Sequence, residues 1–298
     1  MKSRVTLFCL ALLFVPWILE TTSRSDKPFS PGDAIKSVGP SVVQIQVMAF
    51  DPKVLPEALK SEIGKRFVRI NVGSGFFVTN DGDVITALHV IKQADELLDK
   101  IQSTSKRLQV VIVKSRTDSQ PEMEAGQITE QVDEDTDHDL ALLKVHSTNG
   151  ESVRPLNLRA ARPADGDQIA VSGFPLQSDV LISNIGWVAS AWPVTSEKLL
   201  IYPGQKVDII DTEAYLADIR VNPGDSGAPV YLVRNGEVLG VCEAYLTAPV
   251  MYRTDHDDQI ATSPDGHALT YNSGLGLVTP ARYVLELLKR NHLTGVPH

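Results

Sequence analysis

The feature that most constrains this chain is a series of short β-branched or apolar segments separated by turn-forming residues. At residues 43–47, Val and Ile alternate with Gln, which is the two-residue period of a half-buried strand. Similar segments follow in two sets, at 67–78, 84–86, 108–113 and 140–145, and then, after Asn149-Gly150, at 168–172, 180–191, 228–233, 238–244 and 274–278. The pattern predicts an all-β fold of two stacked barrels or sandwiches.

Helical patterns are scarce by comparison. A short helix is expected to begin near His89. A second is expected over residues 281–291, where apolar residues form a stripe directly after Pro280. Only these two helices are expected, and the second is interpreted as a packing helix.

The first 23 residues are set apart from the fold. Lys2 and Arg4 precede an apolar run of about 15 residues, Val5 to Leu19, whereas a membrane-spanning helix needs about 20. A short apolar run behind basic residues is typical of a secretory signal peptide. Residues 1–23 therefore predict export to the periplasm or the outside of the cell; the alternative is an uncleaved membrane anchor formed by residues 5–19.

Net charge limits the classes of binding partner, and cysteine content limits the disulfide bonds that the chain can form. The formal charge of −9 opposes general binding to nucleic acid or to anionic lipid, so protein or peptide partners are expected. Of the two cysteines, Cys9 lies in the signal segment and Cys242 in an apolar run. No internal disulfide is expected after processing, and Cys242 is interpreted as a small buried hydrophobic residue.

The strongest local motif is Asn222-Pro-Gly-Asp-Ser-Gly-Ala-Pro229, which places a serine between glycines in a tight turn before a strand. Amide hydrolysis needs a nucleophile, a base, and donors for the oxyanion of the transition state. Ser226 is the candidate nucleophile, and the backbone N–H groups of Gly224 and Ser226 are the candidate donors. Taken alone, the motif is also compatible with an ordinary turn.

Two further motifs carry the other groups that such chemistry needs. In Ile85-Thr-Ala-Leu-His-Val90, His89 ends a strand, and histidine titrates near neutral pH as a general base should. In Asp137-His-Asp-Leu-Ala-Leu-Leu-Lys144, Asp139 directly precedes a buried strand, where a carboxylate can orient an imidazole. Asp135 and Asp137 are rival partners for the histidine.

Together the three motifs occur in the order His, Asp, Ser, which differs from the order in subtilisins and α/β-hydrolases. From about Val43 to the final helix the chain resembles the trypsin-like peptidases, and among them the HtrA/Deg-type branch. Gly173-Phe-Pro175 and Gly274-Leu-Gly-Leu-Val-Thr-Pro280 resemble further landmarks of that branch.

The resemblance implies a chymotrypsin-like double six-stranded β-barrel with a C-terminal helix. The first barrel is expected over residues 35–150, and the second barrel with the helix over 151–291. The triad of His89, Asp139 and Ser226 would lie between the barrels. No Ile-Val-Gly-Gly activation sequence is present. No PDZ domain is expected, and the oligomeric state stays open.

The expected activity is that of a serine endopeptidase acting through an acyl-enzyme on protein or peptide substrates, without a metal or a cofactor. The main alternative is a catalytically inactive binding protein on the same fold, because fold alone does not settle function. A metal hydrolase is less well supported, since the seven histidines include no His-x-x-x-His pair.

Substrate preference is the weakest inference from the sequence. In trypsin-like enzymes the residue six before the nucleophile commonly lies at the base of the specificity pocket, and here that residue is Arg220. A buried guanidinium would favour acidic side chains unless Glu243, on the expected pocket wall, neutralises it. The HtrA resemblance instead implies a preference for small aliphatic side chains.

Overall fold

The computed structural model describes residues 29–49, 68–100, 106–114, 122–146, 154–194, 213–253 and 258–293. The predicted signal peptide, residues 1–23, and the alternative anchor, residues 5–19, lie outside these ranges. Within the described ranges, none of the helices has the length and apolarity needed to cross a bilayer.

The first half of the chain forms a closed barrel of six antiparallel strands. Its order is β1-β2-β3-β6-β5-β4, and β1 closes the barrel by pairing with both β2 and β4. The strands are β1 (Val42–Ala49), β2 (Val68–Phe77), β3 (Asp83–Ala87), β4 (Lys106–Lys114), β5 (Glu122–Asp135) and β6 (Leu140–His146). Helix α2 (Leu88–Lys100) follows β3 directly, so the expected helix near His89 is confirmed.

The second half forms another closed barrel of six strands, in the order β10-β11-β14-β9-β8-β7. These strands are β7 (Gln168–Gly173), β8 (Ile182–Val194), β9 (Ala214–Asp218), β10 (Pro229–Leu232), β11 (Val238–Pro249) and β14 (Thr270–Pro280). A separate hairpin of β12 (Met251–Arg253) and β13 (Asp258–Ile260) lies between β11 and β14 in the chain. Helix α3 (Ala281–Arg290) follows β14, so the double-barrel fold with a C-terminal helix is confirmed.

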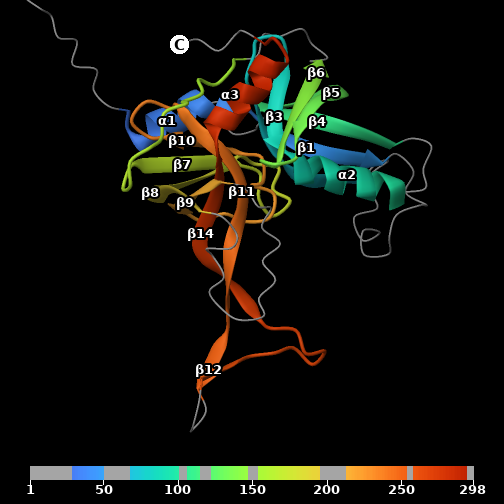
Figure 1. Cartoon of the computed structure of the whole chain (residues 1–298). Coiled ribbons are helices and arrows are strands. Elements are labelled where there is room, and N and C mark those ends of the chain that lie inside the picture. Colours follow the sequence, from blue (N-terminus) through green and yellow to red (C-terminus); the bar gives the residue numbers. More distant parts are fainter. Residues whose placement is uncertain are drawn as a thin grey trace, which may run out of the picture.

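The two barrels lie side by side (Figure 1), and buried apolar side chains of both belong to one core cluster. Phe76 and Leu140 of the first barrel belong to the same buried cluster as Tyr231 and Val241 of the second. The apolar stripe of α3 joins this cluster through residues that include Leu287. Burial of such side chains contributes about 1.5–3 kcal/mol each, so the barrels are held together by their core.

The expectation of only two helices is wrong, because α1 (Pro31–Val38) precedes the first barrel. Ser30 caps this helix: its Oγ accepts from the Asp33 amide, and the Asp33 carboxylate accepts from the Ser30 amide. Pro31 follows the cap at the first helical position. The capping box and the proline are local signals for this helix in the sequence.

Strand β5 was also missed, because acidic and other polar residues hide its alternation. It pairs with β4 on one side and β6 on the other, so ladder hydrogen bonds from two neighbours define it. Its Asp133 accepts a hydrogen bond of 2.7 Å from the Arg290 guanidinium of α3. Pairing with distant segments thus outweighs the weak local strand propensity of β5.

Candidate active site

His89 and Asp139 meet where β3, α2 and β6 come together. His89 is the second residue of α2, and Asp139 lies in the turn directly before β6. His89 Nδ1 is 2.5 Å from Asp139 Oδ2, and the His89 backbone amide donates to Asp139 Oδ1 over 2.8 Å. A carboxylate at Nδ1 favours the tautomer that carries its proton there, which leaves Nε2 as the proton acceptor.

Asp139 is fixed by its backbone as well as by its side chain. The Leu88 amide donates to the Asp139 carbonyl over 2.8 Å, so the residue contacts the first turn of α2 through three acceptor atoms. Asp139 has a φ of +51° and its side chain is 1% exposed. Strain of this kind persists where the surroundings over-determine a conformation, as they do here.

The two rival acids have other positions. Asp135 is 2.8 Å from Nδ1 of His138 and also accepts from two backbone amides of its own turn. Asp137 is exposed. Among the three acids of this turn, Asp139 is the one that contacts His89.

The serine motif forms a tight turn in which two amides stay available. The amides of Asp225, Gly227 and Ala228 each donate to a backbone carbonyl. Those of Gly224 and Ser226, the predicted oxyanion donors, have no acceptor among the described residues. A site for a developing oxyanion requires backbone N–H groups that do not already donate to the protein, and these two amides meet that requirement.

Gly224 is required at its position for two reasons. Its φ is +102°, a conformation that side-chain-bearing residues rarely adopt. A Cβ at this position would lie 2.5 Å from the Phe174 carbonyl oxygen. The turn before Ser226 therefore depends on glycine.

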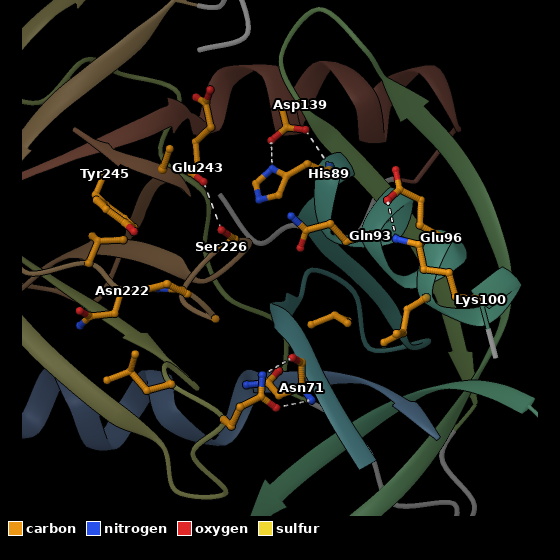
Figure 2. A pocket seen from close by; sticks show the side chains of 18 residues that line it. Asn71, His89, Gln93, Glu96, Lys100, Asp139, Asn222, Ser226, Glu243 and Tyr245 are labelled. Carbon is orange, nitrogen blue, oxygen red and sulfur yellow. Dashed lines mark hydrogen bonds and ion pairs between the residues drawn. The ribbon is translucent and has the colours of Figure 1, made fainter. Parts of the chain in front are cut away.

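The Ser226 hydroxyl does not contact His89 in this structure. Its Oγ donates to the Glu243 carbonyl over 3.2 Å, and in Figure 2 it is directed towards that oxygen, away from the imidazole. The structure thus brings Ser226 into the same cavity as His89 and Asp139 without a hydrogen bond between serine and histidine. Catalytic hydrogen bonds are often long or misaligned until substrate is bound.

Sequence reasoning missed Ser74, which connects the two barrels at the site. Ser74 Oγ of β2 donates to the Gly224 carbonyl over 2.7 Å, and its amide donates to the Ser226 carbonyl over 2.8 Å. A Cβ at Gly227 would lie 2.1 Å from the Ser74 carbonyl, so the two backbones are in close contact. The small residues Gly73-Ser-Gly75 were the only local signal of this contact.

An open cavity of about 990 Å³ contains the site. Besides the three predicted catalytic residues it is lined by Asn71, Val72, Gln93, Glu96, Leu97, Lys100, Leu176, Gln177, Val221, Asn222, Pro223, Gly224, Glu243, Ala244 and Tyr245. Arg220 is exposed and does not belong to this lining. Glu243 does line it, but the residue is only 4% exposed. Its carboxylate accepts from Thr279 Oγ1 over 3.0 Å and points away from Ser226 (Figure 2).

Two buried ionisable groups lie near Ser226, the candidate nucleophile. Cys242 is fully buried, and burial, together with nearby Asp225 and Glu243, raises the pKa of its thiol well above the usual value. Asp225 is 1% exposed, and burial raises the pKa of its carboxyl to about 6, although the Asn222 amide donates to its Oδ2 over 2.9 Å. Its Oδ1 has no hydrogen-bond partner among the described residues.

This raised pKa predicts a pH-dependent stability. In the folded state Asp225 holds its proton up to about pH 6, whereas an unfolded aspartate loses it near pH 4. The contribution of the Asp225 carboxyl to the free energy of unfolding is therefore fully present below pH 4. It is lost as pH rises to about 6, and the loss amounts to up to about 3 kcal/mol. We expect the free energy of unfolding of Asp225→Asn, relative to wild type, to increase between pH 4 and pH 7.

Urea denaturation of both proteins across that range measures the difference, and Asp179→Asn, at an exposed aspartate, is the matched control. A difference between Asp225→Asn and wild type that stays constant with pH would show that the Asp225 carboxyl does not titrate as its burial indicates.

The chain is similar in sequence to known proteins. A family model described as a trypsin-like peptidase domain matches residues 73–241. A probable periplasmic serine endoprotease, DegP-like, of Halomonas elongata is 29% identical over 208 residues, which cover 64% of this chain and 36% of that protein. Serine protease HTR4 of Bos taurus is 26% identical over 226 residues, covering 75% of this chain and 38% of that protein.

The fold has a counterpart among solved structures. The HtrA-type protease AlgW, solved with a decapeptide, superposes with a TM-score of 0.55 over 89% of this chain and 68% of that chain, at 18% identity. This likeness concerns the fold. The chain spans about a third of the length of the curated relatives described above.

Proposed function

The chain belongs to the trypsin-like peptidase domain family, and we propose that it is a serine endopeptidase with His89, Asp139 and Ser226 as its catalytic triad. The observation that carries the proposal is the 2.5 Å contact between His89 Nδ1 and Asp139 Oδ2 in the cavity that Ser226 also lines. A peptide bond of a protein or peptide substrate is the group that this arrangement attacks. The reaction needs no cofactor.

The first half-reaction forms an acyl-enzyme. Rotation of the Ser226 side chain transfers its hydrogen bond from the Glu243 carbonyl to Nε2 of His89. Oγ then attacks the substrate carbonyl carbon while Nε2 takes the hydroxyl proton, and Asp139 stabilises the imidazolium that forms. The Gly224 and Ser226 amides donate to the oxyanion, and such donors contribute about 2.7–4 kcal/mol each to the transition state.

To complete the first half-reaction, the imidazolium gives its proton to the leaving amine, the peptide C–N bond breaks, and the new amino terminus departs, which leaves the acyl-enzyme ester at Ser226. The second half-reaction restores the enzyme. Water then attacks the ester at Ser226 with His89 again as base, which releases the new carboxyl terminus and returns the proton to Oγ. Both products of one peptide bond are accounted for without an external reactant other than water.

The lining of the cavity near Ser226 supports small aliphatic side chains before the cut bond. Val221 and Ala244 present apolar surface there, and Arg220 lies outside the cavity. An acidic side chain would lose its hydration in this region without a guanidinium to receive it. A preference for small aliphatic residues is therefore part of the proposal.

Export is also proposed. It rests on the basic and apolar pattern of residues 1–23 and on the relatives that are named periplasmic. Retention of residues 5–19 as an anchor is the alternative, and N-terminal sequencing of the chain recovered from cells distinguishes the two.

The activity is tested by incubating the purified chain with an unfolded protein and identifying new termini by mass spectrometry. We expect cleavage after small aliphatic residues, unaffected by a metal chelator and abolished by a fluorophosphonate, because a serine nucleophile needs no metal. Arg220→Ala should leave the cleavage profile unchanged. Cleavage that a chelator stops would indicate a metal hydrolase, and a lack of cleavage would indicate the inactive binding protein.

A further inference from the structure

His138, the residue directly before the proposed catalytic aspartate, takes no part in the reaction described above. It lies in the turn between β5 and β6 and does not belong to the lining of the cavity. Its imidazole makes two contacts within the protein. Nδ1 is 2.8 Å from Asp135 Oδ2, and the ring stacks on Tyr283 of α3 with the two ring centroids 3.4 Å apart and the ring planes at 19° to each other.

Asp135 closes the turn around His138. Besides contacting Nδ1 of His138, its carboxylate accepts from the Asp137 amide over 3.1 Å and from the His138 amide over 3.2 Å. An aspartate that accepts from amides two and three residues further along the chain stabilises a tight turn. Asp135 therefore fixes the imidazole of His138 relative to the backbone that leads into Asp139.

The ring of Tyr283 is fixed by the second barrel. Helix α3 follows β14 of that barrel and packs against β5 and β6 of the first (Figure 1). The Tyr283 hydroxyl donates over 2.7 Å to the carboxylate of Glu213, directly before β9, and accepts over 2.7 Å from the Arg282 guanidinium. Tyr283 also belongs to the core cluster that contains side chains of both barrels. The stack therefore connects the turn before Asp139 to a side chain that has little freedom to move.

Asp139 needs support from both of its neighbours in the chain. Its φ of +51° is a conformation that side-chain-bearing residues keep only where the surroundings hold them in it. Leu140, which follows it, is fully buried in the core. His138, which precedes it, is held by Tyr283 and Asp135. Without the stack we expect the turn to relax, and the Asp139 carboxylate to move away from His89.

We propose that His138 is a positioning residue, whose stack on Tyr283 keeps both carboxylate oxygens of Asp139 in contact with His89. This inference rests on the proposed peptidase function. His138 acts through Asp139 and contacts neither the substrate nor the reacting atoms. Its imidazole suits the role because the ring is planar, as stacking requires, and because Nδ1 can donate to Asp135 at the same time. The position of a catalytic group of the first barrel then depends on a helix that follows the second.

The test measures kcat and KM on a fluorogenic peptide for His138→Ala and for Tyr283→Leu, which removes the stacking ring but keeps apolar volume in the core. We expect kcat to fall about thirtyfold in each variant, since a misplacement of about 1 Å can cost about a hundredfold. KM should stay within about twofold of wild type, because neither residue belongs to the lining of the cavity. Titration of active sites with a fluorophosphonate corrects kcat for protein that has not folded.

Further variants separate positioning from general stabilisation. Because His138 and Tyr283 act through one contact, His138→Ala/Tyr283→Leu should be no slower than the slower single variant. Tyr283→Phe restores the ring without the hydroxyl and should turn over about tenfold faster than Tyr283→Leu. His267→Ala is the matched control, since His267 Nε2 also lies near a carboxylate, 3.6 Å from Asp265 Oδ2, but the residue is exposed between β13 and β14. The control should keep kcat within about twofold of wild type.

A spectroscopic measurement separates this proposal from the peptidase assignment. The proton between His89 Nδ1 and Asp139 gives a downfield ¹H NMR signal, which is assigned by its loss in His89→Ala and is observed in Ser226→Ala protein without turnover. We expect this signal to move upfield and broaden when His138→Ala is added, because the carboxylate no longer stays against Nδ1. An absence of turnover in wild type, with the signal still dependent on His138, would refute the peptidase and keep the positioning of Asp139 by the stack.

Three results would overturn the proposal. One is a signal that His138→Ala leaves unchanged. The second is a kcat within about threefold of wild type in folded His138→Ala. The third is a pair of losses that multiply in His138→Ala/Tyr283→Leu, since independent effects on stability would combine in that way.

Discussion

Ser226→Ala and His89→Ala are each expected to lower turnover on the order of a million-fold while the fold is retained. In the proposed mechanism Ser226 supplies the attacking oxygen, and among the described residues that line the cavity His89 is the base that contacts a buried carboxylate. Because the two act in one step, the double variant should be no slower than either single one. Steady-state cleavage of a fluorogenic peptide measures the effect, and circular dichroism checks folding.

Replacement of Ser226 by alanine removes few contacts from the folded structure. Its hydroxyl makes one hydrogen bond, to the Glu243 carbonyl, and both barrels remain linked through Ser74. Wild-type turnover in purified Ser226→Ala, or losses that multiply in the double variant, would contradict a shared catalytic role.

Asp139→Asn is expected to lower turnover by about ten thousand-fold, through the tautomer of His89. The asparagine Oδ1 can still accept from the His89 amide, and asparagine tolerates the positive φ of this position. Its amide group would then face Nδ1 and donate to it. The imidazole proton would move to Nε2, where it blocks acceptance of the serine proton.

Asp137→Asn is the matched control. Asp137 is exposed in the same turn, whereas the residue of this turn that contacts His89 is Asp139. We expect the control to keep turnover within about twofold of wild type, as surface substitutions usually have small effects. A loss below tenfold in Asp139→Asn would show that the carboxylate is not needed to orient His89.

Local sequence patterns were sufficient to predict much of the fold and of the candidate site of this protein. Alternation and turn residues predicted most strands, and three short motifs named residues that line one cavity. These signals are local because a strand's period and a tight turn are properties of neighbouring residues. The resemblance to the trypsin-like peptidases that these motifs carry then implied the double-barrel topology, which the structure confirms.

Other features depend on contacts between distant segments. Ser74 lies about 150 positions before the loop that it holds, and polar β5 is defined by its two neighbouring strands. The direction of the Ser226 hydroxyl depends on a carbonyl of another strand. The position of Arg220 outside the cavity follows from the path of its loop. None of these leaves a periodic signal in the sequence.

The most direct measurement of the central claim is the site of covalent labelling by a fluorophosphonate. The probe needs a nucleophile activated by its base, and peptide mapping by mass spectrometry identifies the modified residue. The triad assignment predicts one label on Ser226, absent from Ser226→Ala and greatly slowed in His89→Ala and Asp139→Asn. Labelling at another residue, or labelling of Ser226 at the wild-type rate in His89→Ala, would contradict it.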